Sequence, residues 1–445
     1  MTNPDLLITG ATLPDGNRAD ILVEGNRVSA VGQGLSSASA TKIDADGLIA
    51  LPGFVDLHTH LREPGYEQSE TVLTGTQAAA LGGFTSVFAM ANTLPVADTA
   101  GVVEQVLRLG DEAGYATVRP IGAVTKGLEG LQLAELGAMA NSRAAVRVFS
   151  DDGKCVFDPL IMRRALEYVK TFGGVIAQHA QEPRLTVDAQ MNEGEVSARL
   201  GLAGWPAVAE ESIIARDVLL AEHTGSRLHI CHLSTAGSVD VIRWAKKRGI
   251  NVTAEVTPHH LLLTDERAES YDARFKVNPP LRRAEDVMAL REALADGTID
   301  IVATDHAPHP VESKDCEWGA AAFGMVGLES ALAVVQTTMV ETGLIGWAEV
   351  ARVMSEAPAR IGGLATHGQK IEPGIQAELV LVDPSTRRNF GVEDLASLSH
   401  NTPYLGIELA GQVVSTIHQG YLTASYRHVV SAETVAAQAE LVARG

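Results

Sequence analysis

Cysteine is scarce in this sequence, and the few cysteines are not arranged for shared chemistry. The chain holds Cys155, Cys231 and Cys316 and no C-x-x-C pair. Three residues cannot make a disulfide framework, and the missing pairs argue against dithiol redox motifs and thiolate zinc sites. We therefore expect a protein of a reducing, cytoplasmic compartment.

Positive charge and long apolar runs are also in short supply. Lysine and arginine total 35 against 55 aspartates and glutamates, so the formal net charge is −20. This imbalance disfavours nucleic acids and anionic membrane surfaces as partners. The N-terminal stretch MTNPDLLITGATL has neither a basic start nor a long apolar run. We expect no signal peptide and no transmembrane helix.

Short apolar runs, in contrast, recur between residues 52 and 364. They are nearly continuous and are separated by helix-like segments, which predicts a parallel sheet buried on both faces. Eight such units over about 300 residues predict an α/β fold of the (β/α)8 TIM-barrel type. The eight runs are GFVDLH, FTSVFAMAN, TVRPIGAV, AAVRVFS, GVIAQHA, RLHICHLS, NVTAEVTPHH and DIVATDHAP.

The two ends of the chain have a different pattern. Residues 1–51 and 365–430 alternate apolar and polar positions and contain turn signals such as PDGN. This pattern is typical of short strands. We expect the two segments to combine into one small β-sandwich domain. Residues 431–445 have a helical pattern, which predicts a C-terminal helical tail with Ser431 as its N-cap.

Polar residues stand where the predicted barrel strands end. His58 and His60 close the first run, His179 the fifth, His232 the sixth and Asp305 the eighth. In a barrel these carboxyl ends meet on one face, where barrel enzymes place their active sites. Burying so many imidazoles and carboxylates is costly unless they share a partner. The joint pattern therefore predicts a metal centre.

The donor types indicate which metal to expect. His58 and His60 are two positions apart, so in a strand their side chains lie on one face, about 6.5–7 Å apart. Alone, such a pair is also explained as two hydrogen-bonded polar residues at a strand end. Imidazole and carboxylate without thiolate suit Zn²⁺, with Mn²⁺, Co²⁺ or Fe²⁺ as substitutes. The number of ligands favours two ions about 3.5–4 Å apart, bridged by a carboxylate and a hydroxide.

The motifs around these residues resemble those of the amidohydrolase superfamily, and within it the longer, type I dihydroorotases of bacteria. The resemblance extends over nearly the whole chain, and HLREPG together with NPPLR separates it from hydantoinases and allantoinases. It implies a zinc-dependent, reversible cyclisation of N-carbamoyl-L-aspartate to L-dihydroorotate in pyrimidine synthesis. The motifs are DLHTHLREPG, MANT, FSDDG, AQHAQE, HLSTA, EVTPHHL, NPPLR, ATDHAPH and FGMVGLE.

The resemblance also implies a ligand set for two zinc ions per subunit. One ion is held by His58, His60 and Asp305, and the other by His179 and His232. In this family a bridging hydroxide attacks the substrate, and Asp305 carries a proton from that hydroxide to the ring nitrogen.

Members of the superfamily differ in the residue that bridges the two metal ions. Many members use a carboxylated lysine, whereas the type I family uses an aspartate in the segment that here reads FSDDGK. The family pattern selects Asp152, with Asp151 as the alternative. Lys154 is near enough to raise the carboxylated-lysine reading, although a plain loop lysine is the simpler interpretation.

Substrate recognition is expected from residues beside the ligands. The planar fork of Arg62 can bind the carboxylate of the substrate that does not react, unless it pairs with Glu63 or Glu67 instead. By resemblance, Asn92 and His309 share this role. The alternatives are a turn or capping role for Asn92 and a plain surface position for His309.

Three further residues complete the predicted substrate site. Asn278, in VNPPLR, is expected to present polar groups to the ring of the substrate. The segment AAAFGMVGLE resembles the loop that covers the substrate, with backbone contacts at Phe323 and Gly324. Small residues in this loop would permit a close approach of the backbone.

Two other functions remain open at this point. One is a different cyclic amidase, such as a hydantoinase, dihydropyrimidinase or allantoinase. The other is a non-catalytic partner of aspartate transcarbamoylase, although such proteins typically lose metal ligands. We expect a small-molecule substrate and a homodimer, and the resemblance adds aspartate transcarbamoylase as a candidate partner protein.

Overall fold

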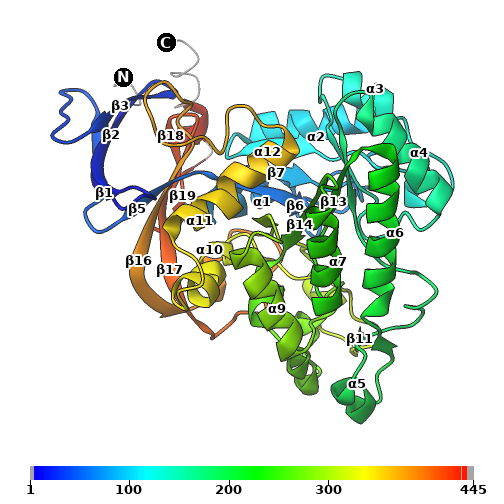
Figure 1. Cartoon of the computed structure of the whole chain (residues 1–445). Helices are drawn as coiled ribbons and strands as arrows, with labels where there is room; N and C mark the ends of the chain where they lie inside the picture. Colours follow the sequence, from blue (N-terminus) through cyan, green and yellow to red (C-terminus); the bar gives the residue numbers. More distant parts are fainter. Residues whose placement is uncertain (1–4, 432, 438–445) are drawn as a thin grey trace.

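The computed structural model describes residues 5–431 and 433–437, and it shows a β-sheet region beside a larger helix-covered region (Figure 1). The sheet region contains both the first and the last strands of the chain. Residues 1–4, 432 and 438–445 lie outside the described part, and they include most of the predicted C-terminal tail.

Strands from both ends of the chain make one nine-stranded sheet. Its order is β19-β18-β17-β16-β5-β1-β2-β3, and β4 pairs with β1. The N-terminal and C-terminal strands join where β5 pairs antiparallel with β16. Hydrogen bonds thus connect the nine strands in a single sheet. The strands are Leu6–Thr12 (β1), Arg18–Glu24 (β2), Arg27–Gly32 (β3), Thr41–Asp44 (β4), Ile49–Pro52 (β5), Leu379–Asn389 (β16), Glu408–His418 (β17), Tyr421–Ser425 (β18) and His428–Val429 (β19).

Each of the eight apolar runs contains a parallel strand. They pair in the orders β6-β7-β8 and β9-β10-β13-β14-β15. Single parallel bridges, Gly122 with Phe149 and Thr59 with His306, link the two groups at both edges. The strands are Phe54–Thr59 (β6), Phe84–Ala89 (β7), Thr117–Pro120 (β8), Val148–Phe149 (β9), Val175–Gln178 (β10), Arg227–Ile230 (β13), Val252–Val256 (β14) and Ile301–Val302 (β15).

These strands are apolar throughout because both of their faces are buried. In β10, Val175 and Ala177 belong to an inner core that also contains residues of the other parallel strands, such as Leu57 and Ile301. Ile176, between them, belongs to a second core that includes helix residues. The period of two in a strand sends neighbouring side chains to opposite faces, so both faces must be apolar.

Helices cover the outside of the parallel strands (Figure 1). Several begin at a side-chain cap, as where the Asp158 carboxylate accepts the backbone N–H groups of Leu160 and Ile161, which satisfies amides that have no partner within the helix. The α-helices are Val72–Leu81 (α1), Ala100–Ala113 (α2), Leu136–Asn141 (α3), Pro159–Lys170 (α4), Glu195–Leu200 (α5), Val208–Thr224 (α6), Ala236–Lys247 (α7), Pro258–Leu262 (α8), Ala284–Ala295 (α9), Ala331–Val335 (α10), Trp347–Ala351 (α11) and Ala357–Gly362 (α12).

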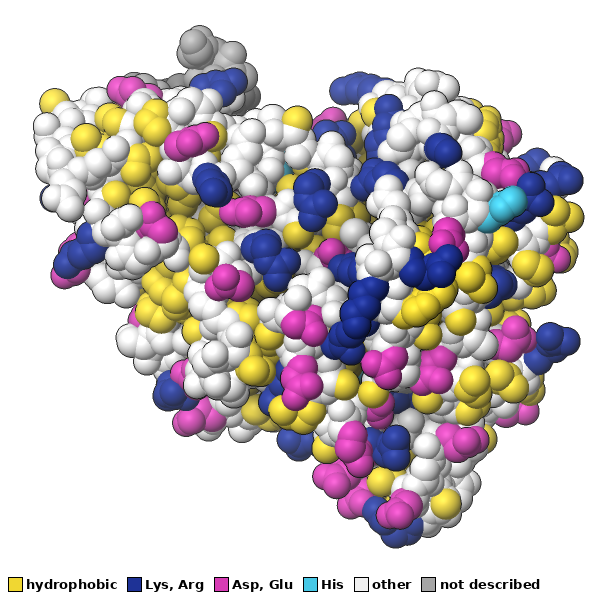
Figure 2. Space-filling model, in the orientation of Figure 1, with side chains coloured by type: hydrophobic (Ala, Val, Ile, Leu, Met, Phe, Trp, Pro, Cys, Tyr) yellow, Lys and Arg dark blue, Asp and Glu magenta, His cyan; other side chains and the backbone are white. Residues whose placement is uncertain are grey.

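The described part of the C-terminal tail is helical at residues 433–437. The Ser431 hydroxyl accepts the Thr434 amide at 3.3 Å, as expected of an N-cap, and Val435 is buried against Tyr115. Among the described residues, no helix combines the length and hydropathy needed to span a membrane. On the face seen in Figure 2, acidic and basic side chains are interspersed.

Candidate metal centre

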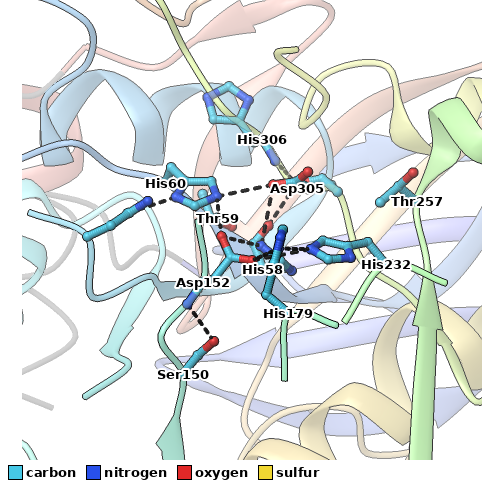
Figure 3. Close-up of polar contacts among 12 residues, drawn as sticks. His58, Thr59, His60, Ser150, Asp152, His179, His232, Thr257, Asp305 and His306 are labelled. Carbon is cyan, nitrogen blue, oxygen red and sulfur yellow. Dashed lines mark hydrogen bonds and ion pairs between the residues drawn. The ribbon is translucent and has the colours of Figure 1, made fainter. Parts of the chain in front are cut away.

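Six predicted ligands converge at the carboxyl ends of the parallel strands (Figure 3). Their ligand atoms form two groups in which all atoms lie within 4.8 Å of one another. Both groups contain Asp152, and all six side chains are buried. The first group is His58, His60, Asp152 and Asp305, and the second is Asp152, His179 and His232.

The two oxygens of Asp152 face different histidine pairs. Oδ2 lies 3.3 Å from His58 Nε2 and 3.2 Å from His60 Nε2. Oδ1 lies 3.1 Å from His179 Nδ1 and 3.2 Å from His232 Nε2. Asp305 Oδ1 closes the first group at 3.3 and 3.1 Å from the same two nitrogens of His58 and His60. A carboxylate between two sets of nitrogens is the arrangement expected of a bridging ligand.

Local backbone conformation directs three of the side chains. His179 follows β10 and continues the inward register of Val175 and Ala177. His232 follows the inner-core residue Cys231, and regular alternation would turn it away; its φ of 31° breaks that alternation. Asp305 also has a left-handed φ, 47°. Such conformations cost about 1–3 kcal/mol in residues other than glycine and cluster at functional sites.

Neighbouring polar groups orient the histidines. His58 Nδ1 lies 2.6 Å from Glu255 Oε1, a contact that turns Nε2 of the ring into the cluster. No hydrogen-bond partner within the described residues satisfies that buried Nε2. His60 Nδ1 lies 2.9 Å from Asn92 Oδ1, which fixes the second ring in the same way. These are the contacts by which proteins orient metal-binding imidazoles, so the residues present fit a metal ion.

The two alternatives to Asp152 lie elsewhere. Asp151 Oδ1 accepts the amides of Val124 and Thr125 at 2.8 and 3.0 Å, and its Oδ2 accepts the Thr125 hydroxyl. Burial raises the pKa of this carboxyl to about 6. Lys154 is exposed and lines a cavity at the mouth of the site. The structure therefore brings only Asp152 of the three into the cluster.

Charge and burial compete within the cluster. Burial alone raises the pKa of Asp152, but the charge of His58 and hydrogen bonds from His179 and His232 outweigh it and hold that pKa well below its usual value. For Asp305 the same competition, burial against the charge of His58, lowers the pKa to about 2. Both groups are carboxylates at neutral pH, the form that binds cations.

A cavity of about 250 Å³ opens beside the cluster. All six predicted substrate-binding residues line it together with four of the predicted ligands. The lining residues are His60, Arg62, Asn92, Asp152, Gly153, His179, Asn278, Asp305, Ala307, His309, Phe323 and Gly324. A pocket of this size suits one small ring, because pockets for larger organic ligands occupy about 300–1,000 Å³.

Arg62 forms the cationic wall of this cavity. Its Nε donates to the Pro308 carbonyl at 3.2 Å, and its φ of 61° is left-handed. Glu63 and Glu67, the predicted alternative partners, instead accept the backbone amides of Val72 and Gly65. Burial lowers the pKa of Arg62 to about 10, so the guanidinium remains charged at neutral pH.

His309 is packed beside Arg62 rather than on the surface. Its Nε2 donates to the Phe323 carbonyl at 2.8 Å. Burial and the charge of Arg62 lower its pKa to about 3, so the ring is neutral. Gly324, with φ of 141°, lies so close that an added Cβ would be 2.8 Å from His309 Nε2. Only glycine fits this contact without displacing a neighbour.

Asn278 and Gln181 connect the cavity to the ligands. Asn278 Nδ2 donates to Gln181 Oε1 at 3.1 Å, and the same oxygen lies 2.8 Å from His179 Nε2. The Oδ1 atom of Asn278 is buried and has no partner among the described residues. A ring that carries N–H groups would satisfy it.

Sequence reasoning missed the residues that support these side chains. Glu255 contacts His58 and His229, and it also accepts the backbone amide of His232 at 3.2 Å. Its signal was available as a single carboxylate within the apolar run NVTAEV. Gln181 gave no such signal, because a glutamine in a polar loop is ordinary.

Two buried lysines, also missed, anchor the loop that carries Phe323. Lys314 Nζ donates to the carbonyls of Ala273, Lys276 and Ala322 at 2.7–3.0 Å. The ammonium group of Lys276 lies 4.4 Å from the centre of the Phe323 ring. This loop is therefore fixed to the segment that precedes Asn278.

Comparisons with known proteins agree with this geometry. A family model described as dihydro-orotase-like matches residues 47–238. The L-hydantoinase (dihydropyrimidinase) of Arthrobacter aurescens superposes with a TM-score of 0.86 at 26% identity, over 97% of this chain and 98% of that one. Fold and ligand cluster together define an amidohydrolase-type enzyme, a class whose members are metal-dependent.

Two relatives identify the family within this class to which the chain belongs. A dihydroorotase of Leifsonia xyli subsp. xyli is 74% identical over 95% of this chain and 97% of its own length. A dihydroorotase of Streptomyces coelicolor is 69% identical over 94% and 97%. The chain belongs to the dihydroorotase family.

Proposed function

We propose that this enzyme interconverts N-carbamoyl-L-aspartate and L-dihydroorotate with two Zn²⁺ ions per subunit. His58, His60 and Asp305 would hold one ion, His179 and His232 the other, and Asp152 would bridge them. The observation that carries the proposal is the division of the Asp152 oxygens between two histidine pairs. We also infer a closed (β/α)8 barrel, which the bridges at both edges of the parallel strands support.

When bound, the ions would lower the pKa of a water molecule and polarise the amide carbonyl of the substrate. Asp305 would move the proton. Its Oδ1 contacts His58 and His60, which leaves Oδ2 to accept a proton from the attacking water and return it to the departing ring nitrogen. In ring closure Asp305 would take the proton from that nitrogen.

The polar wall of the cavity would select a substrate with a second carboxylate. Arg62 has no carboxylate partner among the described ion pairs and stays cationic, so its fork can bind an anion, an interaction that a planar guanidinium makes in bidentate fashion. Neutral His309 and the Asn92 amide flank it. Asn278 and the backbone at Phe323 and Gly324 would contact the ring.

Substrate choice tests the proposal directly. The purified, zinc-loaded enzyme should open L-dihydroorotate, while hydantoin and allantoin, which lack the ring carboxylate, should be poor substrates. Ring closure consumes a proton and a carboxylate. The equilibrium should therefore favour dihydroorotate at about pH 6 and carbamoyl-aspartate at about pH 9, because both substrate carboxylates stay ionised across that range. Preference for hydantoin would assign the chain to the hydantoinase reaction instead.

Two predictions about partners stay open to experiment. A homodimer would show as twice the chain mass in native mass spectrometry. An association with aspartate transcarbamoylase would show as co-elution of the two purified proteins. A chain without bound metal and without turnover would support the role of a non-catalytic partner.

A further inference from the structure

A second cluster of metal-binding residue types lies outside the catalytic centre. It consists of His367, Glu378 and His418, whose ligand atoms all lie within 4.8 Å of one another. His367 follows α12, Glu378 precedes β16, and His418 ends β17. The cluster therefore joins the segment after the last helix to the nine-stranded sheet.

The cluster is buried and closely spaced. The side chains of His367, Glu378 and His418 are only 2–3% exposed. His418 Nδ1 lies 2.9 Å from Glu378 Oε2, and His367 Nε2 lies 3.7 Å from Glu378 Oε1. Two ligands on one tetrahedral Zn²⁺ are separated by about 3.3 Å, since each bond is about 2.0–2.1 Å long. The observed spacings bracket that value.

One nitrogen in the cluster is left without a partner. His367 Nε2 is buried and makes no hydrogen bond within the described part of the chain, since 3.7 Å to Glu378 is too long for one. The other nitrogen, Nδ1, lies 3.1 Å from the Thr366 hydroxyl. With its proton on Nδ1 for that contact, the ring would present the Nε2 lone pair toward the carboxylate. A cation between Nε2 and the carboxylate would then satisfy both groups.

Hydrogen bonds fix the orientation of the carboxylate in this cluster. Gln376 Nε2 and the Gln419 amide donate to Glu378 Oε1, the oxygen that lies 3.7 Å from His367 Nε2.

The cluster is separate from the catalytic centre. The backbone carbonyl of Glu378 accepts the amide of Gly53, the residue before β6. His58 and His60 lie at the opposite end of the same strand. Six strand residues span about 20 Å, too far for one ion to be shared between the two clusters.

We propose that His367, Glu378 and His418 bind a divalent transition-metal ion, Zn²⁺ first of all, at a structural site. The ion would hold the segment after α12 against the ends of β16 and β17. Three protein ligands leave one position of a tetrahedral ion for a further donor.

Metal counting tests this site apart from catalysis. The whole chain is loaded with Zn²⁺, desalted, and analysed by plasma mass spectrometry as wild type, as His367→Gln and as His428→Gln, an exposed histidine of the same sheet. The His367→Gln variant should hold about one ion per chain fewer than wild type, because metal sites lose affinity when one ligand is removed. The His428→Gln variant should match wild type. Both should open dihydroorotate at the wild-type rate.

Equal metal content in folded wild type and His367→Gln would overturn the proposal, whatever the catalytic centre holds. If the variant does not fold, a zinc-edge anomalous map of the wild-type crystal decides instead. A peak between His367 Nε2 and Glu378 supports the site, and no peak there overturns it. Loss of all metal and all turnover in wild type would contradict the proposed function as well, so the two failures are distinguishable.

Discussion

Replacing Gly324 with alanine tests how the loop beside the cavity recognises substrate. The added methyl group would lie 2.8 Å from His309 Nε2 and 2.9 Å from the Ala307 Cβ, distances too short for real contacts. The backbone φ of 141° is also one that residues with a side chain rarely adopt. The loop backbone and the His309 ring must therefore move apart, which shifts His309 from its place beside the cavity.

The cost can be estimated from the contacts that this movement breaks. His309 loses its 2.8 Å hydrogen bond to the Phe323 carbonyl, worth about 1 kcal/mol. His309 also loses its place beside Arg62, where it would donate a hydrogen bond to the carboxylate of the substrate. One hydrogen bond to a charged carboxylate is worth about 1.5–3 kcal/mol. The two contributions total about 2.5–4 kcal/mol, which corresponds to a loss of about 70- to 900-fold in kcat/KM.

Gly319, in the same loop, provides a matched control. An added Cβ at Gly319 has no neighbour within 4 Å, so Gly319→Ala should behave as wild type. The assay is the opening of L-dihydroorotate, followed by its ultraviolet absorbance, with bound metal counted in parallel. The loss should fall mainly on KM, and the metal content should not change. Equal kinetics for the Gly324→Ala and Gly319→Ala variants would refute this account of the loop.

Four other changes probe the remaining parts of the site. Asp152→Asn should lower the bound metal by more than half, and unchanged metal by plasma mass spectrometry would exclude Asp152 as the bridge. Arg62→Gln should reduce kcat/KM for dihydroorotate by about 30- to 100-fold, from the loss of charge-assisted hydrogen bonds, with metal content unchanged; a loss of metal would mean that Arg62 supports the fold. Asp305→Asn should reduce kcat by about 100-fold or more with an unaltered circular dichroism spectrum, and near-normal turnover would exclude Asp305 as the proton carrier. Burial lowers the pKa of Lys314 to about 7 from 10.5. Between these two values the unfolded chain binds a proton that the folded chain does not. Lys314 therefore makes folding more favourable as the pH rises from about 7 to about 10. Lys314→Met should remove that part of the pH slope in urea unfolding, and an identical slope would contradict the shift.

The parallel strands could be predicted from the sequence because burial on both faces makes each of them a short, nearly continuous apolar run. Each of the eight apolar runs contains a parallel strand, since a strand between two cores must be apolar throughout. The pairing of the terminal strands was less well specified. Alternating residues identify a strand with one buried face, but they do not identify its partner, so the sequence does not reveal that β5 pairs with β16.

In the candidate site, too, some residues could be predicted from the sequence and others could not. Histidines and aspartates at strand ends are visible in the sequence because several of them follow apolar runs whose carboxyl ends meet on one face of a barrel. The contacts that orient them are not visible. Glu255 and Gln181 act through distances of 2.6 and 2.8 Å to rings that are far away in the sequence, and Lys314 acts on backbone carbonyls. Only the folded chain reveals such pairs.

The position of Asp152 between the two histidine pairs has a consequence for how the enzyme matures. A bridge made from a carboxylated lysine must capture carbon dioxide before the metals can assemble, and it is lost when that gas is removed. An aspartate is supplied by translation itself, so the bridge proposed for Asp152 needs no such capture. Metal should therefore restore the emptied protein equally well in degassed, bicarbonate-free buffer.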